Sequence, residues 1–175
     1  MSLTGHNNYF EDFTVGQVIK HARGKTMCEQ DNVGITLQVL NTAEGHFNEH
    51  AMQQNTMGQD GWDQRLQFGG VTIAMVIGLT MQDTGENALR ELKLTKIRLK
   101  APVFHGDTLY AYSEVLQTTP ADQDDAGLVA FKHWGVNQHD IVVFEGERTV
   151  LVKRRSHHAP TAAPTTTPTT TQAKS

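Results

Sequence analysis

One short segment of the chain, residues 41–48, combines side-chain types that acid–base chemistry uses. It reads Asn-Thr-Ala-Glu-Gly-His-Phe-Asn, so an amide (Asn41), a carboxylate (Glu44) and an imidazole (His46) follow one another closely. Histidine can accept and return a proton near neutral pH because its unperturbed pKa is about 6.5. His46 is therefore a candidate general base. The competing interpretation is a structural histidine that hydrogen-bonds a neighbour at the end of a helix.

A predicted helix precedes this segment. Residues 31–40 carry Val33, Leu37 and Leu40 at spacings of four and three residues, which is typical of one apolar face of a helix. The helix would end just before Asn41 and present the polar segment at its end.

A second predicted helix follows, over residues 71–81, and Gly69 and Gly70 open it. This stretch is apolar on nearly every side, which favours a helix that is buried on most faces. The backbone N–H groups at a helix start are unpaired and favour negative charge. Glycine also lets a ligand approach the backbone closely. Gly69 and Gly70 are therefore candidates for binding an anionic oxygen.

The second half of the chain has the alternation of strands. Apolar and charged residues alternate over 92–100, with a slip of one residue near Thr95 that predicts a β-bulge. Further strands are expected at 108–116, 127–136 and 141–152. Early helices and late antiparallel strands predict an α+β fold in which one sheet wraps around a central helix.

Length and composition limit the classes of protein to which the chain can belong. The chain has 175 residues and a formal charge of −4, which suits one domain and gives no indication of nucleic-acid binding. Apolar runs are too short to span a membrane, and the N-terminus lacks the pattern of a signal peptide. A cytoplasmic location is expected. Residues 156–175 become rich in Thr, Pro and Ala, so the domain is expected over 1–155 and a disordered tail beyond it.

Residues 46–50 also spell H-x-x-E-H, a pattern in which two histidines one helical turn apart bind zinc. That motif needs one helix across all five residues, and Gly45 and Asn48 are poor helix formers. No metal is expected here.

Several segments together resemble the MaoC-like hydratases and dehydratases. The run from Asn41 to His46 is similar to the family signature Gly-Asp-x-Asn-Pro-aliphatic-His, with His46 on the family histidine. Residues 100–109 resemble the family pattern (K/R)-(A/F)-P-V-x-x-G-D-T-L. The opening run at 10–16 and the late segments at 135–138 and 149–152 are similar as well. The resemblance covers residues 9–153 and implies a hot-dog fold.

The resemblance also implies an activity, the reversible addition of water to a 2-enoyl-CoA thioester. His46 would act as the base, Asn41 would orient the water, and the amide of Gly69 or Gly70 would bind the thioester oxygen. No metal or redox cofactor is implied, since coenzyme A is part of the substrate. Family members place the site at a dimer interface, so a homodimer or higher homo-oligomer is expected, with no nucleic-acid or membrane partner.

The same segment also bears on the acyl group of the substrate. The run Asn41-Thr42-x-x-x-His46-Phe47 resembles members that act on branched five-carbon diacyl thioesters such as mesaconyl-, itaconyl- or methylmalyl-CoA. A second carboxylate on the substrate would need a cation, for which Arg65 is the first candidate and Arg98 the second. Phe47 and Phe68 are expected as pocket walls.

Asn41 departs from the family, which usually has an aspartate at this position. An amide has no titratable proton at neutral pH, so His46 would transfer both protons, or Glu44 or Glu49 would take part. Two other functions remain open. One is a non-catalytic acyl-CoA-binding protein, and the other is an acyl-CoA thioesterase.

Overall fold

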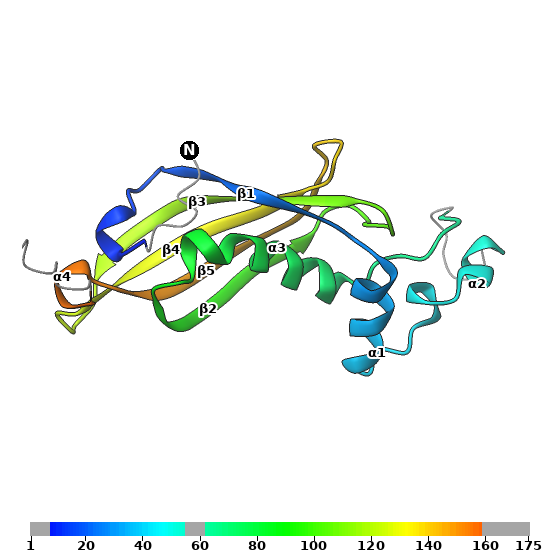
Figure 1. Ribbon diagram of the computed structural model, residues 1–175, viewed down its shortest axis with the longest axis horizontal. Coiled ribbons are helices and arrows are strands. Elements are labelled where there is room, and N and C mark those ends of the chain that lie inside the picture. The colour runs from blue at the N-terminus through cyan, green and yellow to red at the C-terminus, as the bar shows by residue number, and fades with distance from the viewer. Residues whose placement is uncertain (1–7, 55–61, 159–175) are drawn as a thin grey trace, which may run out of the picture.

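The computed structural model describes residues 8–54 and 62–158. Figure 1 shows a curved antiparallel sheet with one long helix lying along it. The strands are arranged in the order β1-β3-β4-β5-β2, and every neighbouring pair is antiparallel. The elements are η1 (Phe10–Asp12), β1 (Val18–Thr26), η2 (Gln30–Gly34), α1 (Ile35–Gln38), η3 (Glu44–His46), α2 (Glu49–Gln53), α3 (Gly69–Thr84), β2 (Ala88–Leu99), β3 (Thr108–Pro120), β4 (Ala126–Val136), β5 (Val142–Lys153) and α4 (Arg155–His158). The predicted α+β fold is confirmed.

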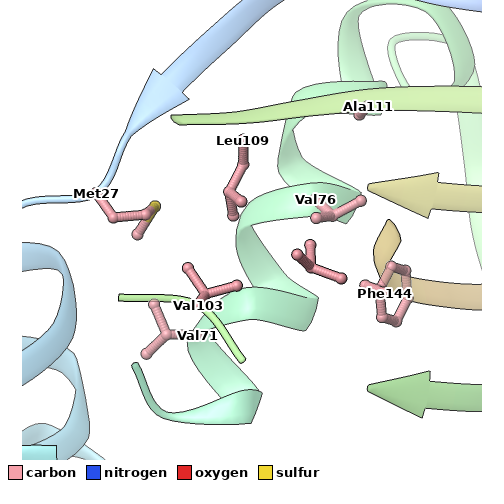
Figure 2. Close-up of a cluster of buried hydrophobic side chains, with 8 residues drawn as sticks. Met27, Val71, Val76, Val103, Leu109, Ala111 and Phe144 are labelled. Carbon is pink, nitrogen blue, oxygen red and sulfur yellow. The ribbon is translucent and has the colours of Figure 1, made fainter. Parts of the chain in front are cut away.

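The central helix α3 is two residues longer at its start, and three at its end, than the apolar run that predicted it. Val76 on this helix is fully buried and lies among side chains from the sheet and the neighbouring loops, as Figure 2 shows. The cluster consists of Met27, Val71, Val76, Val103, Leu109, Ala111, Val143 and Phe144. Among the described residues, no helix combines the length and the apolar character that crossing a bilayer requires.

The bulge predicted near Thr95 is present. The register between β2 and β5 shifts between Thr95 and Arg98, and Lys96 has a positive φ of 52°. An extra residue in one strand turns later side chains to the opposite face, which explains the slip in the alternation. At the far end of the chain, α4 begins at Arg155, so helical structure extends to His158. The remainder of the predicted tail lies outside the described residues.

The helix expected over residues 31–40 is present as η2 followed by α1, but the predicted buried face is wrong. Leu37 is 48% exposed and Leu40 is 85% exposed. The buried side chains of this segment are instead polar, namely Asn32 and Thr36. The spacing of apolar residues therefore located the helix but not its inward face, because this helix covers the polar loops around residues 46 and 66 instead of an apolar core.

A row of polar side chains crosses the whole sheet beneath the C-terminal end of α3, and all of them except Glu91 at the edge are buried. It takes one residue from each strand, in the order of the sheet: His21, Ser113, His133, Arg148 and Glu91. Asp83 and Thr84 on α3 bind the row from above. The row separates the cluster of Figure 2 from a second apolar cluster formed by Phe13, Ile19, Val115, Val129, Phe131, Val150 and Val152.

From Arg148 to Asp83, the hydrogen bonds of this row run in one direction. Arg148 can only donate, so His133 Nε2, at 3.5 Å, accepts and Nδ1 carries the proton. His133 Nδ1 then donates to Ser113 Oγ at 2.7 Å, and Ser113 donates to His21 Nε2 at 2.7 Å. His21 Nδ1 finally donates to Asp83 at 2.6 Å. This pattern requires that both histidines are neutral.

The row predicts that acid destabilises the fold. Burial lowers the pKa of His133 well below 6.5, and the nearby Arg148 and His21 lower it further. Burial also lowers the pKa of His21, although Asp83 opposes the shift. The unfolded chain therefore binds more protons than the folded one as pH falls below about 6.5, and stability falls with it. We expect the midpoint of urea unfolding to be constant from pH 8 to 7 and to fall from pH 6.5 to 5.

The control for this prediction is His139→Ala, because His139 is exposed and should leave the pH dependence unchanged. A midpoint that is flat down to pH 5 in the unmodified protein would contradict the assignment of two neutral buried histidines.

Candidate active site

His46 is held by the backbone of a segment twenty residues away. It ends the short helix η3, and its Nδ1 lies 3.0 Å from the carbonyl oxygen of Leu66. A carbonyl oxygen only accepts, so Nδ1 must carry the proton. The Leu66 N–H in turn donates to the Gly45 carbonyl at 2.9 Å. These contacts fix the imidazole in the tautomer whose Nε2 has a free lone pair, which is the form that a general base needs.

The imidazole lies at a pocket of about 340 Å³ next to the start of α3. Its ring packs against Phe68, with centroids 5.5 Å apart. The pocket is mostly apolar, with a few polar groups, which is typical of a site for a small organic ligand. It is lined by His46, Trp62, Leu66, Gln67, Gly69, Thr72, Leu99, Lys100, Ala101, Pro102 and Val103.

Gly69 forms both the first residue of α3 and part of the pocket wall. The N-cap residue is Phe68, which makes no side-chain capping bond to the helix. The N–H groups of the first turn therefore lack a side-chain cap where the pocket meets the helix. A Cβ on Gly69 would lie 2.3 Å from Leu99 Cδ1, so glycine is the residue that fits here without a shift of Leu99. Gly70 follows it and packs against the Phe68 ring.

Asn41 and Phe47 are not among the residues that line this pocket. The side chain of Asn41 accepts a hydrogen bond from the Ala43 N–H at 3.1 Å, and the backbone N–H of Asn41 donates to the Thr36 carbonyl at 3.0 Å. This local turn ends the preceding helical segment. The structure thus brings together His46, Phe68 and Gly69 but leaves Asn41 outside that group.

Arg65 is occupied by two carboxylates. Its guanidinium donates to Glu29 and, at 2.8 Å, to Glu49, and its backbone N–H also donates to Glu49. The hydrogen bonds that Glu29 accepts from Arg65 lower the pKa of Glu29, and the hydrogen bonds that Arg65 donates to both carboxylates raise the pKa of Arg65. Arg65 does not line the pocket. Of the two carboxylates considered as proton donors, Glu49 is bound to Arg65, while Glu44 is exposed.

The cation that lines the pocket is Lys100. Its Nζ is 3.8 Å from Glu145 Oε1, and 44% of its side chain is exposed, so the ammonium group is only loosely held. The sequence carried a signal for it, because Lys100 directly precedes the Ala101-Pro102 turn that closes one wall of the pocket. Arg98, on the preceding strand β2, is 69% exposed, contacts Glu145 and does not line the pocket. The H-x-x-E-H pattern is divided between two elements, since η3 ends at His46 and α2 begins at Glu49.

A sheet wrapped around one helix, with His46 in the pocket beside the start of that helix, is the arrangement of a MaoC-like domain with the hot-dog fold. A MaoC domain protein from Chloroflexus aurantiacus has a similar structure, with a TM-score of 0.74 and 29% identity over 86% of this chain and 46% of that one. A conserved hypothetical protein from Mycobacterium tuberculosis, which has a double hotdog fold, aligns with a TM-score of 0.68 and 21% identity. That alignment covers 90% of this chain and 48% of the other.

The family model for mesaconyl-CoA hydratase matches residues 18–154. The chain therefore belongs to the mesaconyl-CoA hydratase family. A mesaconyl-CoA hydratase from Haloarcula marismortui is 32% identical over 163 residues, which is 87% of this chain and 44% of the relative. The chain thus spans less than half the length of that relative.

Proposed function

We propose that this domain catalyses the reversible addition of water to a 2-enoyl-CoA thioester. The observation that carries the proposal is that His46, whose Nδ1 donates to the Leu66 carbonyl, lines the same pocket as Gly69 at the start of α3. Membership of the mesaconyl-CoA hydratase family supports it. The reaction needs a base for water, a donor for the α-carbon and a group that stabilises the enolate oxygen formed between them.

His46 supplies the first two functions in turn. Its Nε2 takes a proton from water while the water oxygen bonds to the β-carbon of the substrate. The electron pair of the carbon–carbon double bond moves to form the enolate of the thioester. The imidazolium then returns a proton from Nε2 to the α-carbon, which closes the cycle without a titratable group at Asn41. No metal or redox cofactor takes part in this scheme.

The start of α3 supplies the third function. A thioester oxygen that lies against Gly69 would meet backbone N–H groups and the positive end of a 16-residue helix. Gly69 lacks the Cβ that would otherwise crowd Leu99. This arrangement stabilises negative charge on the oxygen as the enolate forms.

We further propose that the acyl group is a branched five-carbon diacid of the mesaconyl type and that Lys100 binds its free carboxylate. Arg65, the first candidate from the sequence, is already bound to Glu29 and Glu49. Lys100 lines the pocket that contains His46 and has only a 3.8 Å contact to Glu145. An ammonium group that is loosely held can turn towards a ligand at little energetic cost.

Lys100→Met should therefore raise KM for mesaconyl-CoA by about 10-fold, the value expected for one hydrogen bond to a charged group, and leave KM for crotonyl-CoA unchanged. The measurement is steady-state hydration of both thioesters. The control is Lys96→Met, because Lys96 lies on the strand β2 that directly precedes Lys100, is 70% exposed and pairs with Glu147. Equal loss on both substrates would show that Lys100 does not recognise the second carboxylate.

The domain is also proposed to pair with a second hot-dog unit, either in a homodimer or in another part of a longer chain. The edge strand β2 exposes a row of large apolar residues: Leu89, Leu92, Leu94, Ile97 and Leu99. An unpaired edge with this composition needs cover. The homodimer is tested by light scattering after size exclusion. A cytoplasmic location stays a prediction from the sequence.

The activity is tested with a panel of crotonyl-, mesaconyl- and itaconyl-CoA, by following loss of the enoyl absorbance. Turnover of at least one member supports a hydratase, and the preferred member identifies the acyl class. Saturable acyl-CoA binding without turnover would instead indicate a binding protein. Release of free thiol from acyl-CoA would indicate a thioesterase.

A further inference from the structure

One buried amide connects the two halves of the proposed site. Asn32 lies on η2 and is 7% exposed. Its Nδ2 donates to the carbonyl oxygens of His46, at 3.0 Å, and Leu66, at 3.2 Å. Its Oδ1 accepts from the Phe68 N–H at 2.9 Å and from the Thr36 hydroxyl at 3.4 Å. All the hydrogen-bonding positions of the amide are thus used.

The partners determine that this residue must be an amide. Two carbonyl oxygens face its nitrogen and a backbone N–H faces its oxygen, so only one orientation satisfies them. A carboxylate of the same shape would place a negative oxygen against two carbonyl oxygens. A smaller side chain would leave these buried groups unpaired, which is costly.

The hydrogen bonds of Asn32 connect it to both proposed catalytic groups, the His46 imidazole and the Gly69 amide. The Leu66 carbonyl that Asn32 binds is the same one that accepts from His46 Nδ1. Phe68, bound by the other end of the amide, is the N-cap of α3 and directly precedes Gly69. One side chain therefore sets the position of the base relative to the helix start. Asn32 does not line the pocket, so it does not act by touching the substrate.

We infer that Asn32 is a positioning residue for hydration, which fixes the tautomer of His46 and its distance from the Gly69 amide. The inference rests on the proposed hydratase function. Misplacement of a catalytic group by about 1 Å can cost about 100-fold in rate. Replacement of Asn32 is expected to lower kcat and to change KM little, because the groups that contact the substrate are unchanged.

The test compares Asn32→Asp with Asn87→Asp. Asn87 is equally buried, at 7% exposure, and its Nδ2 also donates to a carbonyl oxygen, that of Asn8, at 3.3 Å. It lies three residues beyond the other end of α3, a 16-residue helix that is about 24 Å long. N32D should lower kcat for the best panel substrate about 100-fold with KM changed less than about 3-fold. N87D should lower stability and leave kcat unchanged.

A second readout does not depend on turnover. In ¹⁵N-histidine spectra, with the signals of His46 identified by their absence in His46→Gln, the wild type should show the Nδ1–H tautomer. N32D should show a mixture of the two neutral tautomers, and N87D should match the wild type. If N32D does not fold, Asn32→Ser takes its place, because serine keeps one donor and one acceptor, and a smaller change in the same direction is expected.

The outcomes separate the two proposals. A wild type without turnover rejects the hydratase function, while the spectra still report on Asn32. A folded N32D or N32S with the wild-type tautomer and wild-type kcat overturns the inference. Equal kcat losses in N32D and N87D also overturn it, because they would show a general effect of buried-amide replacement.

Discussion

His46→Ala should lower kcat for hydration by about 10² to 10⁴-fold, the usual contribution of a positioned general acid–base group. In the proposed mechanism the same nitrogen takes the proton from water and returns a proton to the α-carbon, so both proton transfers are lost together. The pocket and the first turn of α3 remain, and substrate binding should change much less than turnover. The measurement is steady-state kinetics on the preferred enoyl-CoA, together with a thermal melt to show that the variant is folded.

The matched control is His50→Ala. His50 is exposed, lies four residues away on α2 and does not line the pocket, so its loss should leave kcat within about 2-fold, as for a surface substitution. A His46→Ala variant that retains a tenth or more of the wild-type kcat would show that another group is the base. Glu44 and Glu49 would then have to be tested in turn.

The sequence located the elements of this fold well where burial and periodicity agree. Helix α3 was predicted from its apolar run, and the slip at Thr95 predicted a bulge that the structure contains. His46 and Gly69 line the same pocket, while the catalytic roles that the MaoC-like resemblance implied for them stay predictions. These features depend on local patterns, either along one strand or helix or within one short motif.

The features that the sequence did not reveal depend on contacts between distant segments. Arg65 was the candidate cation for the second carboxylate of the substrate. Its partner Glu29 is 36 residues away in the sequence, and no local pattern links the two residues. Asn32 was missed because a helix between polar loops buries its polar side, and apolar periodicity then indicates the wrong face. Lys100 directly follows β2 and lines the pocket, whereas Arg98, within the strand, does not line it.

Arg148→Ala should destabilise the fold by about 3 kcal/mol. The side chain is only 2% exposed and donates to the hydroxyl and carbonyl oxygens of Thr84 and to His133 Nε2. Its removal leaves buried acceptors unpaired, at about 1–3 kcal/mol each, and opens a cavity in the row between two apolar clusters. The partner Glu91 is 53% exposed and can be hydrated, so its share of the loss is small.

Urea unfolding with an unchanged m-value measures this loss, and Arg98→Ala is the control. Arg98 is also a strand arginine with a glutamate partner, but it is 69% exposed and 3.6 Å from Glu145, so its removal should cost less than about 0.5 kcal/mol. Arg148→Met separates the loss of hydrogen bonds from the opening of a cavity, because methionine fills most of the volume of the arginine but cannot donate a hydrogen bond. If Arg148→Met is as stable as the wild type, the directed hydrogen bonds contribute nothing, and the row is retained for a reason other than stability. If it loses about half of the alanine penalty, the unpaired acceptors of Thr84 and His133 account for that half, and the acid sensitivity of the fold follows from the same bonds.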